Sequence, residues 1–144
     1  GPSVFKLKVV PPDRVGPLEI ETSPHPGFPT DLQAQFMALL CLASGTSKIT
    51  ENIFPNRFIH AAELRKLGAK INLEANVATI LGVDSLTGAK MQASDLRASA
   101  SLLIGALAAK GKSEIYRIYH LDRGYESIDN KLKEIGGKVW REKE

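Results

Sequence analysis

The stretch Thr30-Asp31-Leu32-Gln33-Ala34 recurs later in the chain as Ser94-Asp95-Leu96-Arg97-Ala98. It is one of three matches that follow in the same order at nearly equal separations, which indicates one supersecondary unit present twice. Both copies place an aspartate at a predicted helix start and an arginine in a later loop, so the repeat predicts a charged site built by pseudo-symmetry. The other two matches pair Asn56-Arg57 with Asp122-Arg123, and Leu67-Gly68-Ala69-Lys70-Ile71 with Ile135-Gly136-Gly137-Lys138-Val139.

Length and composition are typical of one globular domain. The 144 residues are 43% hydrophobic and 24% charged, which provides apolar material for a core and argues against disorder. The net charge of +3 is compatible with an anionic ligand, but it is too small and too scattered to indicate nucleic-acid binding. We expect no membrane span, no signal peptide and, with one cysteine, no disulfide framework.

Capping and turn signals extend each match into a unit of the order βαβαββ, over about residues 18–83 and 84–144, the second unit cut short by the end of the chain. The predicted fold class is α/β (α+β), with mixed sheets and helices packed against them. Thr30 and Gln33 have capping-box spacing, and Gly45, Gly68, Gly111 and Gly136 are predicted helix ends. Gly1-Pro2 before Ser3 is typical of a tag-cleavage remnant, so residues 1–3 are set apart. We expect strands at 4–10, 18–22, 47–53, 70–74, 77–83, 90–93, 113–119 and 138–141, a loop at 121–124, and helices from 30 to about 44 and at 59–67, 94–110 and 125–135.

Asp31 is the candidate general base. It follows a stiff loop with prolines at 24, 26 and 29, at a helix start where the helix dipole favours a carboxylate. A carboxylate held in fixed geometry can accept the proton of a hydroxyl. The alternative, that Asp31 and Asp95 are only helix-start residues, is the simpler interpretation of either aspartate alone.

Arg57, Arg97 and Arg123 are candidate anion-binding residues. Arg97 lies in a predicted first helical turn, where a cation is unfavourable unless an anion is bound nearby. Arg57 and Arg123 occupy matching loops, and surface ion pairs, such as one between Arg123 and Glu126, are the competing explanation. His25, His60 and His120 lack metal-ligand spacing, Cys41 is predicted to be a buried structural thiol, and phosphate-loop, dinucleotide and zinc motifs are absent, so we expect no metal or cofactor.

At these residues the chain resembles a known family. Residues 26–36, Pro-Gly-Phe-Pro-Thr-Asp-Leu-Gln-Ala-Gln-Phe, resemble the segment with the key aspartate of the UDP-N-acetylglucosamine 1-carboxyvinyltransferases. Residues 51–58, 94–100 and 119–126 resemble three further motifs of that family, in the same order. The likeness runs from about Leu18 to the end of the chain.

The resemblance implies an activity and roles for individual residues. The family is cytoplasmic and bacterial; it transfers the enolpyruvyl group of phosphoenolpyruvate to the 3′-hydroxyl of UDP-N-acetylglucosamine and releases phosphate, the first committed step of peptidoglycan synthesis. Asp31 would contact the sugar and act as the base near its 3′-hydroxyl. Ile53 would contact UDP-N-acetylglucosamine through its backbone, and Arg57, Arg97 and Arg123 would hold the phosphate and carboxylate of phosphoenolpyruvate.

The resemblance also implies a fold. Family members have two similar domains, each an inside-out α/β barrel of three βαβαββ units, and residues 4–144 would provide two of the three units of one domain. The other domain, with the family's reactive-cysteine loop and further basic residues, has no counterpart here, and Cys41 does not match that cysteine. We therefore expect negligible turnover by the chain alone, and self-association through exposed apolar surface.

Three alternatives remain open at this point. The sister family that transfers enolpyruvyl to shikimate 3-phosphate shares the fold and the arginine pattern. A non-catalytic binding module built from the same repeat would explain the missing half. An RNA-end-processing protein on a related repeat fold is disfavoured by the modest net charge.

Overall fold

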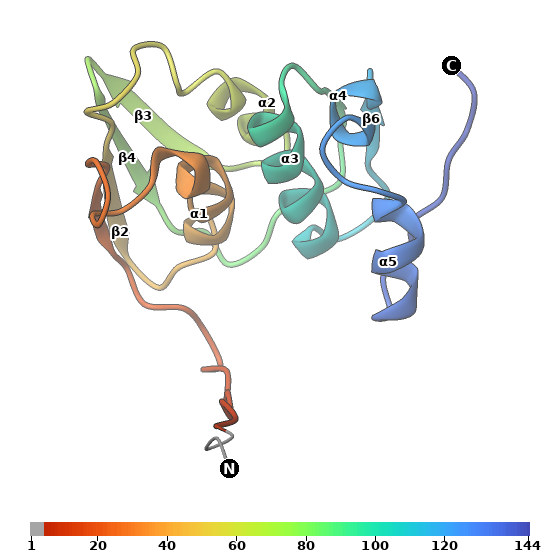
Figure 1. Ribbon diagram of the computed structural model, residues 1–144, viewed down its shortest axis with the longest axis horizontal. Helices are drawn as coiled ribbons and strands as arrows, with labels where there is room; N and C mark the ends of the chain where they lie inside the picture. The colour runs from red at the N-terminus through yellow and green to blue at the C-terminus, as the bar shows by residue number, and fades with distance from the viewer. Residues whose placement is uncertain (1–4) are drawn as a thin grey trace.

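A computed structural model describes residues 5–144, in which two sheets lie on either side of a central group of helices (Figure 1). The expected tag remnant at 1–3, and the first residue of the expected strand at 4–10, lie outside the described residues. The larger sheet has four strands in the order β1 (Glu19–Glu21), β2 (Thr46–Thr50), β4 (Val77–Leu81) and β3 (Lys70–Glu74), and the smaller sheet has two, β5 (Lys90–Gln92) and β6 (Glu114–Tyr116). Among residues 5–144, no helix is both long and apolar enough to cross a membrane.

The first unit has the complete predicted order βαβαββ. Strands β1 and β2 are parallel and are connected through a 3-10 turn, η1, and helix α1, while β4 pairs antiparallel with both β2 and β3. Helix α2 connects β2 to the β3–β4 hairpin. The elements of this unit are β1 (Glu19–Glu21), η1 (Thr30–Leu32), α1 (Gln33–Leu40), β2 (Thr46–Thr50), α2 (His60–Lys66), β3 (Lys70–Glu74) and β4 (Val77–Leu81).

The second unit repeats the βαβα part of this order. Its two strands are parallel, as β1 and β2 are in the first unit, and a long helix connects them. Its elements are β5 (Lys90–Gln92), α3 (Leu96–Ala108), β6 (Glu114–Tyr116), α4 (Tyr119–Asp122) and α5 (Ile128–Glu134).

Helix α3 lies at the centre of the molecule and packs against α1, α2 and α4 (Figure 1). Its buried residues are mostly small, from Ala98 to Ser101 and Gly105, and a Cβ atom at Gly105 would lie 3.0 Å from Leu67 Cδ1. Small side chains allow the helices to approach closely, and larger residues fill the core around them. Fully buried core side chains include Met37, Leu40, Ile49, Leu64, Ile80 and Leu102.

Two matched glycines end helices as the repeat predicted. Gly68 after α2 has φ 94° and Gly136 after α5 has φ 100°, a backbone conformation that glycine adopts without strain. Gly111 after α3 also has positive φ, at 86°. The prediction for Gly45 was wrong, because α1 already ends at Leu40 and the chain then turns irregularly into β2.

Two expected strands are irregular in the structure. Phe5, Leu7, Val9 and Val10 are between 78% and 91% exposed, and residues 138–141 pair with no strand among residues 5–144. Alternation of side chains cannot stabilise a strand that has no neighbour to complete its hydrogen bonds. Residues 121–124 were expected to form a loop, but α4 extends to Asp122.

Arg14 fixes the irregular N-terminal segment to the first unit. Its guanidinium donates to the carbonyl oxygens of Leu42 at 3.0 Å, Ala43 at 2.9 Å and Val83 at 3.0 Å, and it pairs with Asp84 at 3.0 Å. The same three carbonyls lie where α1 and β4 end, so the arginine binds the open ends of both elements.

Cys41 is the buried structural thiol that the sequence predicted. Its Sγ donates to the Met37 carbonyl at 3.2 Å, and burial raises the pKa of the thiol to about 12. Only the thiolate reacts with disulfide reagents. The folded chain at pH 8 should therefore react about a thousandfold more slowly with a disulfide reagent than the chain unfolded in guanidinium. Rapid labelling of folded protein, followed by absorbance, would contradict this placement.

Candidate functional site

Asp31 and Arg97 form an ion pair that joins the two units. Asp31 lies in η1, Arg97 is the second residue of α3, and Arg97 Nη2 is 2.6 Å from Asp31 Oδ1. Both side chains are partly exposed, at 63% for Asp31 and 40% for Arg97. We expected a bound anion to explain a cation in the first turn of a helix, and here the Asp31 carboxylate provides that negative charge.

Asp95 is the N-cap of α3, one residue later than expected. Its Oδ1 accepts a hydrogen bond from the Ala98 N–H at 2.9 Å, so its carboxylate satisfies one of the free donors at the helix start. For Asp95 the simpler interpretation as a helix-start residue is therefore correct, whereas Asp31 does not cap its helix and its carboxylate faces Arg97.

Arg57 lies in the tight turn between β2 and α2. The preceding residue, Asn56, has φ 58°, a left-handed conformation that asparagine tolerates better than most residues. The Arg57 guanidinium lies 4.3 Å from the centre of the Phe54 ring, and the Arg57 carbonyl accepts a hydrogen bond from Gln33 Nε2 at 3.2 Å. The turn therefore presents its cation toward the region between α1 and α3.

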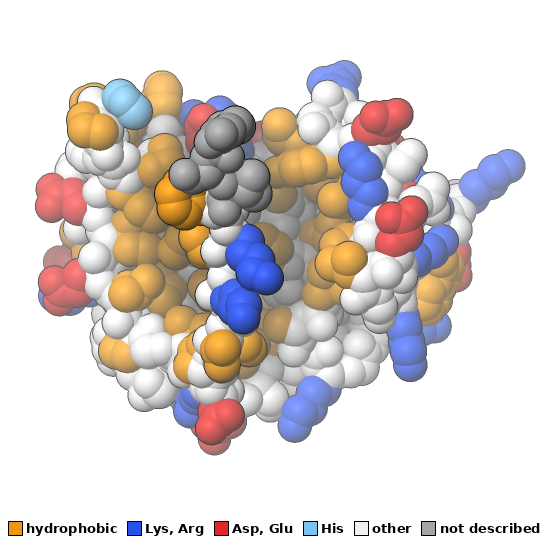
Figure 2. Space-filling view, turned by 60° about the horizontal axis from the view of Figure 1, so that its bottom comes forward, with side chains coloured by type: hydrophobic (Ala, Val, Ile, Leu, Met, Phe, Trp, Pro, Cys, Tyr) orange, Lys and Arg blue, Asp and Glu red, His pale blue; other side chains and the backbone are white. Residues whose placement is uncertain are grey.

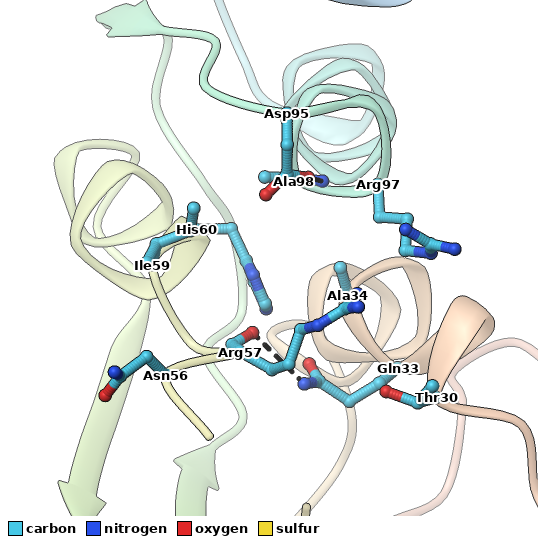
Figure 3. A pocket seen from close by; sticks show the side chains of 10 residues that line it. All are labelled: Thr30, Gln33, Ala34, Asn56, Arg57, Ile59, His60, Asp95, Arg97 and Ala98. Atoms are coloured by element: carbon cyan, nitrogen blue, oxygen red, sulfur yellow. Dashed lines mark hydrogen bonds between the residues drawn. The ribbon is translucent and has the colours of Figure 1, made fainter. Parts of the chain in front are cut away.

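A small pocket lies where η1, α1, α2 and α3 meet (Figure 3). Its volume of about 20 Å³ provides room for about one water molecule. Figure 3 shows Arg97 reaching from α3 toward the start of α1, and the His60 ring pointing from α2 into the space between these segments. The lining residues are Thr30, Gln33, Ala34, Asn56, Arg57, Ile59, His60, Asp95, Arg97 and Ala98.

Two buried polar side chains face this pocket. His60 and Gln33 are 3% and 1% exposed, and within residues 5–144 His60 Nε2 and Gln33 Oε1 have no hydrogen-bond partner. Burial lowers the pKa of His60 to about 4, although the Asp95 carboxylate opposes this shift. The imidazole is therefore neutral at pH 7, and the positive charge of the pocket comes from Arg57 and Arg97.

Glu51 connects several segments of the site through its buried carboxylate. It follows β2, is 4% exposed, and its carboxylate accepts hydrogen bonds from two hydroxyls, one amide and two backbone N–H groups. Burial alone raises the pKa of Glu51, but these hydrogen bonds outweigh it and hold the pKa below its ordinary value of 4.5. The donors are Thr22 Oγ1 and Thr30 Oγ1 at 2.7 Å, Ile53 N at 3.0 Å, Gln33 Nε2 at 3.2 Å and Phe54 N at 3.4 Å.

The Thr30 and Gln33 side chains do not form the predicted capping box. Neither makes a side-chain cap to the helix start, because both donate to Glu51 across the fold. The T-x-x-Q pattern did indicate two polar side chains on one helical face, but the sequence does not show which acceptor they reach. Thr30, Gln33, Glu51 and His60 are the residues of this region that sequence reasoning missed.

The structure places Ile53 beside Glu51, whereas Arg123 lies at the end of α4. The Ile53 N–H already donates to Glu51, so a backbone contact from Ile53 to a ligand would have to use its carbonyl. Arg123 ends α4 and lies 5.6 Å from the centre of the Tyr119 ring. A Cβ atom at Gly124 would lie 2.4 Å from Leu96 Cδ1, so this turn packs against the residue before Arg97. Among residues 5–144, no ion pair joins Arg123 to Glu126.

A wider hollow of about 420 Å³ adjoins the small pocket, and Ile59 lines both. Its other lining residues come from α2, the end of β5 and α4, and they are Glu63, Gln92, Ala93, Ser94, Arg117, Tyr119 and His120. Across residues 5–144, no group of three or more His, Cys, Asp or Glu side chains is placed to hold a metal ion. The site therefore offers two guanidinium groups, one exposed carboxylate and polar hydrogen-bonding groups, a set suited to an anionic ligand with a hydroxyl.

The comparison with known proteins agrees with this chemistry. The family model described as EPSP synthase (3-phosphoshikimate 1-carboxyvinyltransferase) matches residues 3–132. The chain belongs to the EPSP synthase family. Within it, the chain is 56% identical over 137 residues to the UDP-N-acetylglucosamine 1-carboxyvinyltransferase of Anaeromyxobacter sp. (strain Fw109-5), covering 95% of this chain and 32% of that protein.

Other members of the family show the same relationship. The UDP-N-acetylglucosamine 1-carboxyvinyltransferase of Geobacter metallireducens is 56% identical over 138 residues, covering 96% of this chain and 33% of that protein. The resemblance predicted from four motifs is thereby confirmed. The chain spans about a third of the length of these curated relatives.

Solved structures of the family show the same fold. The enolpyruvyl transferase NikO of Streptomyces tendae superposes with a TM-score of 0.80 at 30% identity, over 89% of this chain and 30% of that chain. EPSP synthase of Acinetobacter baumannii superposes with a TM-score of 0.63 at 18% identity, over 88% of this chain and 28% of that chain. The predicted repeat fold of the enolpyruvyltransferases is confirmed, although residues 5–144 contain no closed barrel.

Proposed function

We propose that this chain provides one side of the site that transfers the enolpyruvyl group of phosphoenolpyruvate to the 3′-hydroxyl of UDP-N-acetylglucosamine. The observation that supports it best is the Asp31–Arg97 pair beside Arg57, a carboxylate and two guanidiniums at one junction. The names of relatives 56% identical to this chain agree with this chemistry. The reaction would belong to peptidoglycan synthesis in the bacterial cytoplasm, and therefore to cell-wall growth and division.

In this proposal the proton and the leaving group are handled by different residues. The Asp31 carboxylate accepts the proton of the sugar hydroxyl while the oxygen of that hydroxyl bonds to the enolpyruvyl carbon. The bond from this carbon to the phosphate oxygen breaks, and phosphate leaves. Arg57, Arg97 and Arg123 stabilise the negative charge on the phosphate and carboxylate. Ile53 contacts the UDP-sugar through its carbonyl.

The ion pair sets the order of the steps, with phosphate binding before proton transfer. Asp31 is neutralised by Arg97 before a ligand arrives, and an exposed pair of this kind contributes only about 0–1 kcal/mol. A phosphate dianion therefore competes readily for Arg97. Once it binds, Asp31 loses its cation and is free to accept a proton.

Titration of the isotope-labelled chain tests the proposal. At low salt, phosphoenolpyruvate and then UDP-N-acetylglucosamine should shift NMR signals of Asp31, Ile53, Arg57 and Arg97. Arg97→Met should weaken phosphoenolpyruvate binding by at least about tenfold, since a charge-assisted hydrogen bond is lost. The control Lys90→Met removes an exposed cation that lines neither pocket and should bind normally. A well-dispersed spectrum without shifts at millimolar ligand would contradict the proposal.

The shikimate 3-phosphate reaction is the second candidate, because the matching family model is named for it. Both acceptors are anions with a hydroxyl, so the arginines alone do not distinguish them. Competition between the two acceptors for the labelled chain does. We expect UDP-N-acetylglucosamine to displace shikimate 3-phosphate; the reverse order would favour the second candidate.

Further parts of the family fold are proposed partners of this chain. Figure 2 shows apolar side chains gathered on the face from which the N-terminal segment leaves the molecule. Large apolar side chains that are between 41% and 81% exposed include Leu39, Leu81, Leu107, Ile135 and Trp140. We propose that exposed apolar surface of this chain packs against the other domain of the family fold. Without that domain, the chain self-associates and releases no phosphate. Phosphate release by the purified chain would contradict this.

A further inference from the structure

We propose that Glu51 is a positioning residue that holds Asp31 and Arg57 in the geometry that binds the two substrates. This inference rests on the proposed function and adds to it a residue that does not touch either ligand.

The Glu51 carboxylate is held from both sides. Oε1 accepts from Thr30 Oγ1 at 2.7 Å and Gln33 Nε2 at 3.2 Å, while Oε2 accepts from Thr22 Oγ1 at 2.7 Å and Ile53 N at 3.0 Å. These donors lie on the end of β1, on η1, on α1 and in the loop after β2. One buried carboxylate thus ties four segments together.

Two of these partners lead directly to the reacting groups. Thr30 precedes Asp31, so the hydrogen bond to Glu51 fixes the peptide that carries the candidate base. Gln33 Nε2 also donates to the Arg57 carbonyl at 3.2 Å, which connects Glu51 to the arginine turn through one side chain.

The loop after β2 makes a second connection to the same arginine. The Phe54 N–H donates to Glu51 Oε2 at 3.4 Å, and the Phe54 ring lies 4.3 Å from the Arg57 guanidinium carbon. Both ends of Arg57, its backbone and its guanidinium, therefore contact groups that Glu51 holds. Glu51 hydrogen-bonds to neither Asp31 nor Arg57 itself, so it acts on both through Thr30, Gln33 and Phe54.

The arrangement requires an ionised carboxylate. All the partners of Glu51 are donors, and an ionised carboxylate is acceptor-only with room for about four such bonds. Glutamine would turn an NH₂ group toward donors and leave at least one of them buried without a partner. Within residues 5–144 no cation pairs with Glu51, so its charge is stabilised by the positioned donors alone.

The test compares Glu51→Gln with Glu114→Gln. The Glu114 carboxylate also accepts a hydrogen bond, from Tyr116 Oη at 2.8 Å, and lies 3.8 Å from Lys90 Nζ, but Glu114 lies on β6 and lines neither pocket. We expect Glu51→Gln to weaken UDP-N-acetylglucosamine and phosphoenolpyruvate by at least about tenfold and to shift the Arg97 guanidinium NMR signal before ligand is added. Glu114→Gln should change neither.

A second variant, Thr30→Val, covers the case in which Glu51→Gln fails to fold. Thr30→Val removes one donor while keeping the shape of the side chain, and it should shift the Arg97 signal and weaken both ligands in the same direction. If both variants fold, their effects on affinity should be less than additive, because they remove the same contact.

Two failures are distinguishable. If the unmodified chain binds neither substrate, the proposed function fails, while the Arg97 signal of the ligand-free variants still decides the role of Glu51. If folded Glu51→Gln binds both substrates as the unmodified chain does, with the Arg97 signal unmoved, the positioning role is overturned. The same result for Thr30→Val would overturn it as well.

Discussion

Replacing Gly82 by alanine is expected to abolish stable folding. A Cβ atom at this position would lie 1.7 Å from the Ala43 carbonyl oxygen and 2.6 Å from its carbon, and neither backbone atom can rotate away. The chain is also held here by hydrogen bonds from Gly82 N to Gly45 O at 3.0 Å and from Val83 N to Cys41 O at 2.8 Å. Relief of the overlap would separate β4 from the end of α1, a loss we place above about 4 kcal/mol.

Thermal unfolding followed by circular dichroism measures this effect. Domains of this size have total stabilities of about 5–15 kcal/mol, so we expect Gly82→Ala to be unfolded or to melt far below the parent. The matched control is Gly16→Ala, where an added Cβ atom meets nothing within 4 Å, and its stability should change by less than about 0.5 kcal/mol. A Gly82→Ala protein that melts with the parent would show that the two segments are farther apart than described.

The stability of the chain should fall as the pH drops from 6.5 toward 4, because of His60. Its ordinary pKa is 6.5, and burial lowers the pKa in the folded state to about 4. Below pH 6.5 the unfolded chain binds a proton that the folded chain does not, so acid favours unfolding. A difference of this size corresponds to about 3 kcal/mol once the pH reaches 4.

Denaturant unfolding at a series of pH values checks this sign. His60→Gln removes the titrating group and should flatten the curve between pH 6.5 and 4.5, even if its stability at pH 7 is lower. His25→Gln is the comparison variant, because it replaces a histidine at an exposed position by the same residue. Carboxylates with lowered pKa, such as Glu51 and Asp122, lose their stabilising contribution at still lower pH. An equal slope in His60→Gln and the parent would contradict the buried, neutral state of His60.

Sequence reasoning predicted the parts of this structure that depend on local chemistry. The repeat led to the βαβαββ order, and the matched Gly68 and Gly136 end their helices because only glycine adopts positive φ without strain. The four motifs led to the family. Asp31, Arg57 and Arg97 meet at one junction because equivalent helices of the two units pack side by side.

The features that sequence reasoning missed depend on partners far along the chain. Thr30 and Gln33 have the spacing of a cap, and only the position of Glu51 after β2 decides that they donate elsewhere. Alternating side chains at 4–10, and the place of residues 138–141 in the repeat, predicted strands, but a strand also needs a neighbour, and residues 5–144 provide none. The buried position of His60 likewise follows from packing of α2 and α3, which its spacing from other residues does not reveal.

The pairing of Asp31 with Arg97 also determines when the site forms during folding. All four strands of the larger sheet come from residues 19–81, whereas the pair exists only after α3 has docked on α1. Contacts that close long loops form late, because the entropy of closure is lost before they contribute. A chain with only its first unit folded therefore has no anion site. Any ligand that needs both units binds only the fully folded chain. Its binding therefore shifts the equilibrium from partly folded molecules to the folded state by mass action.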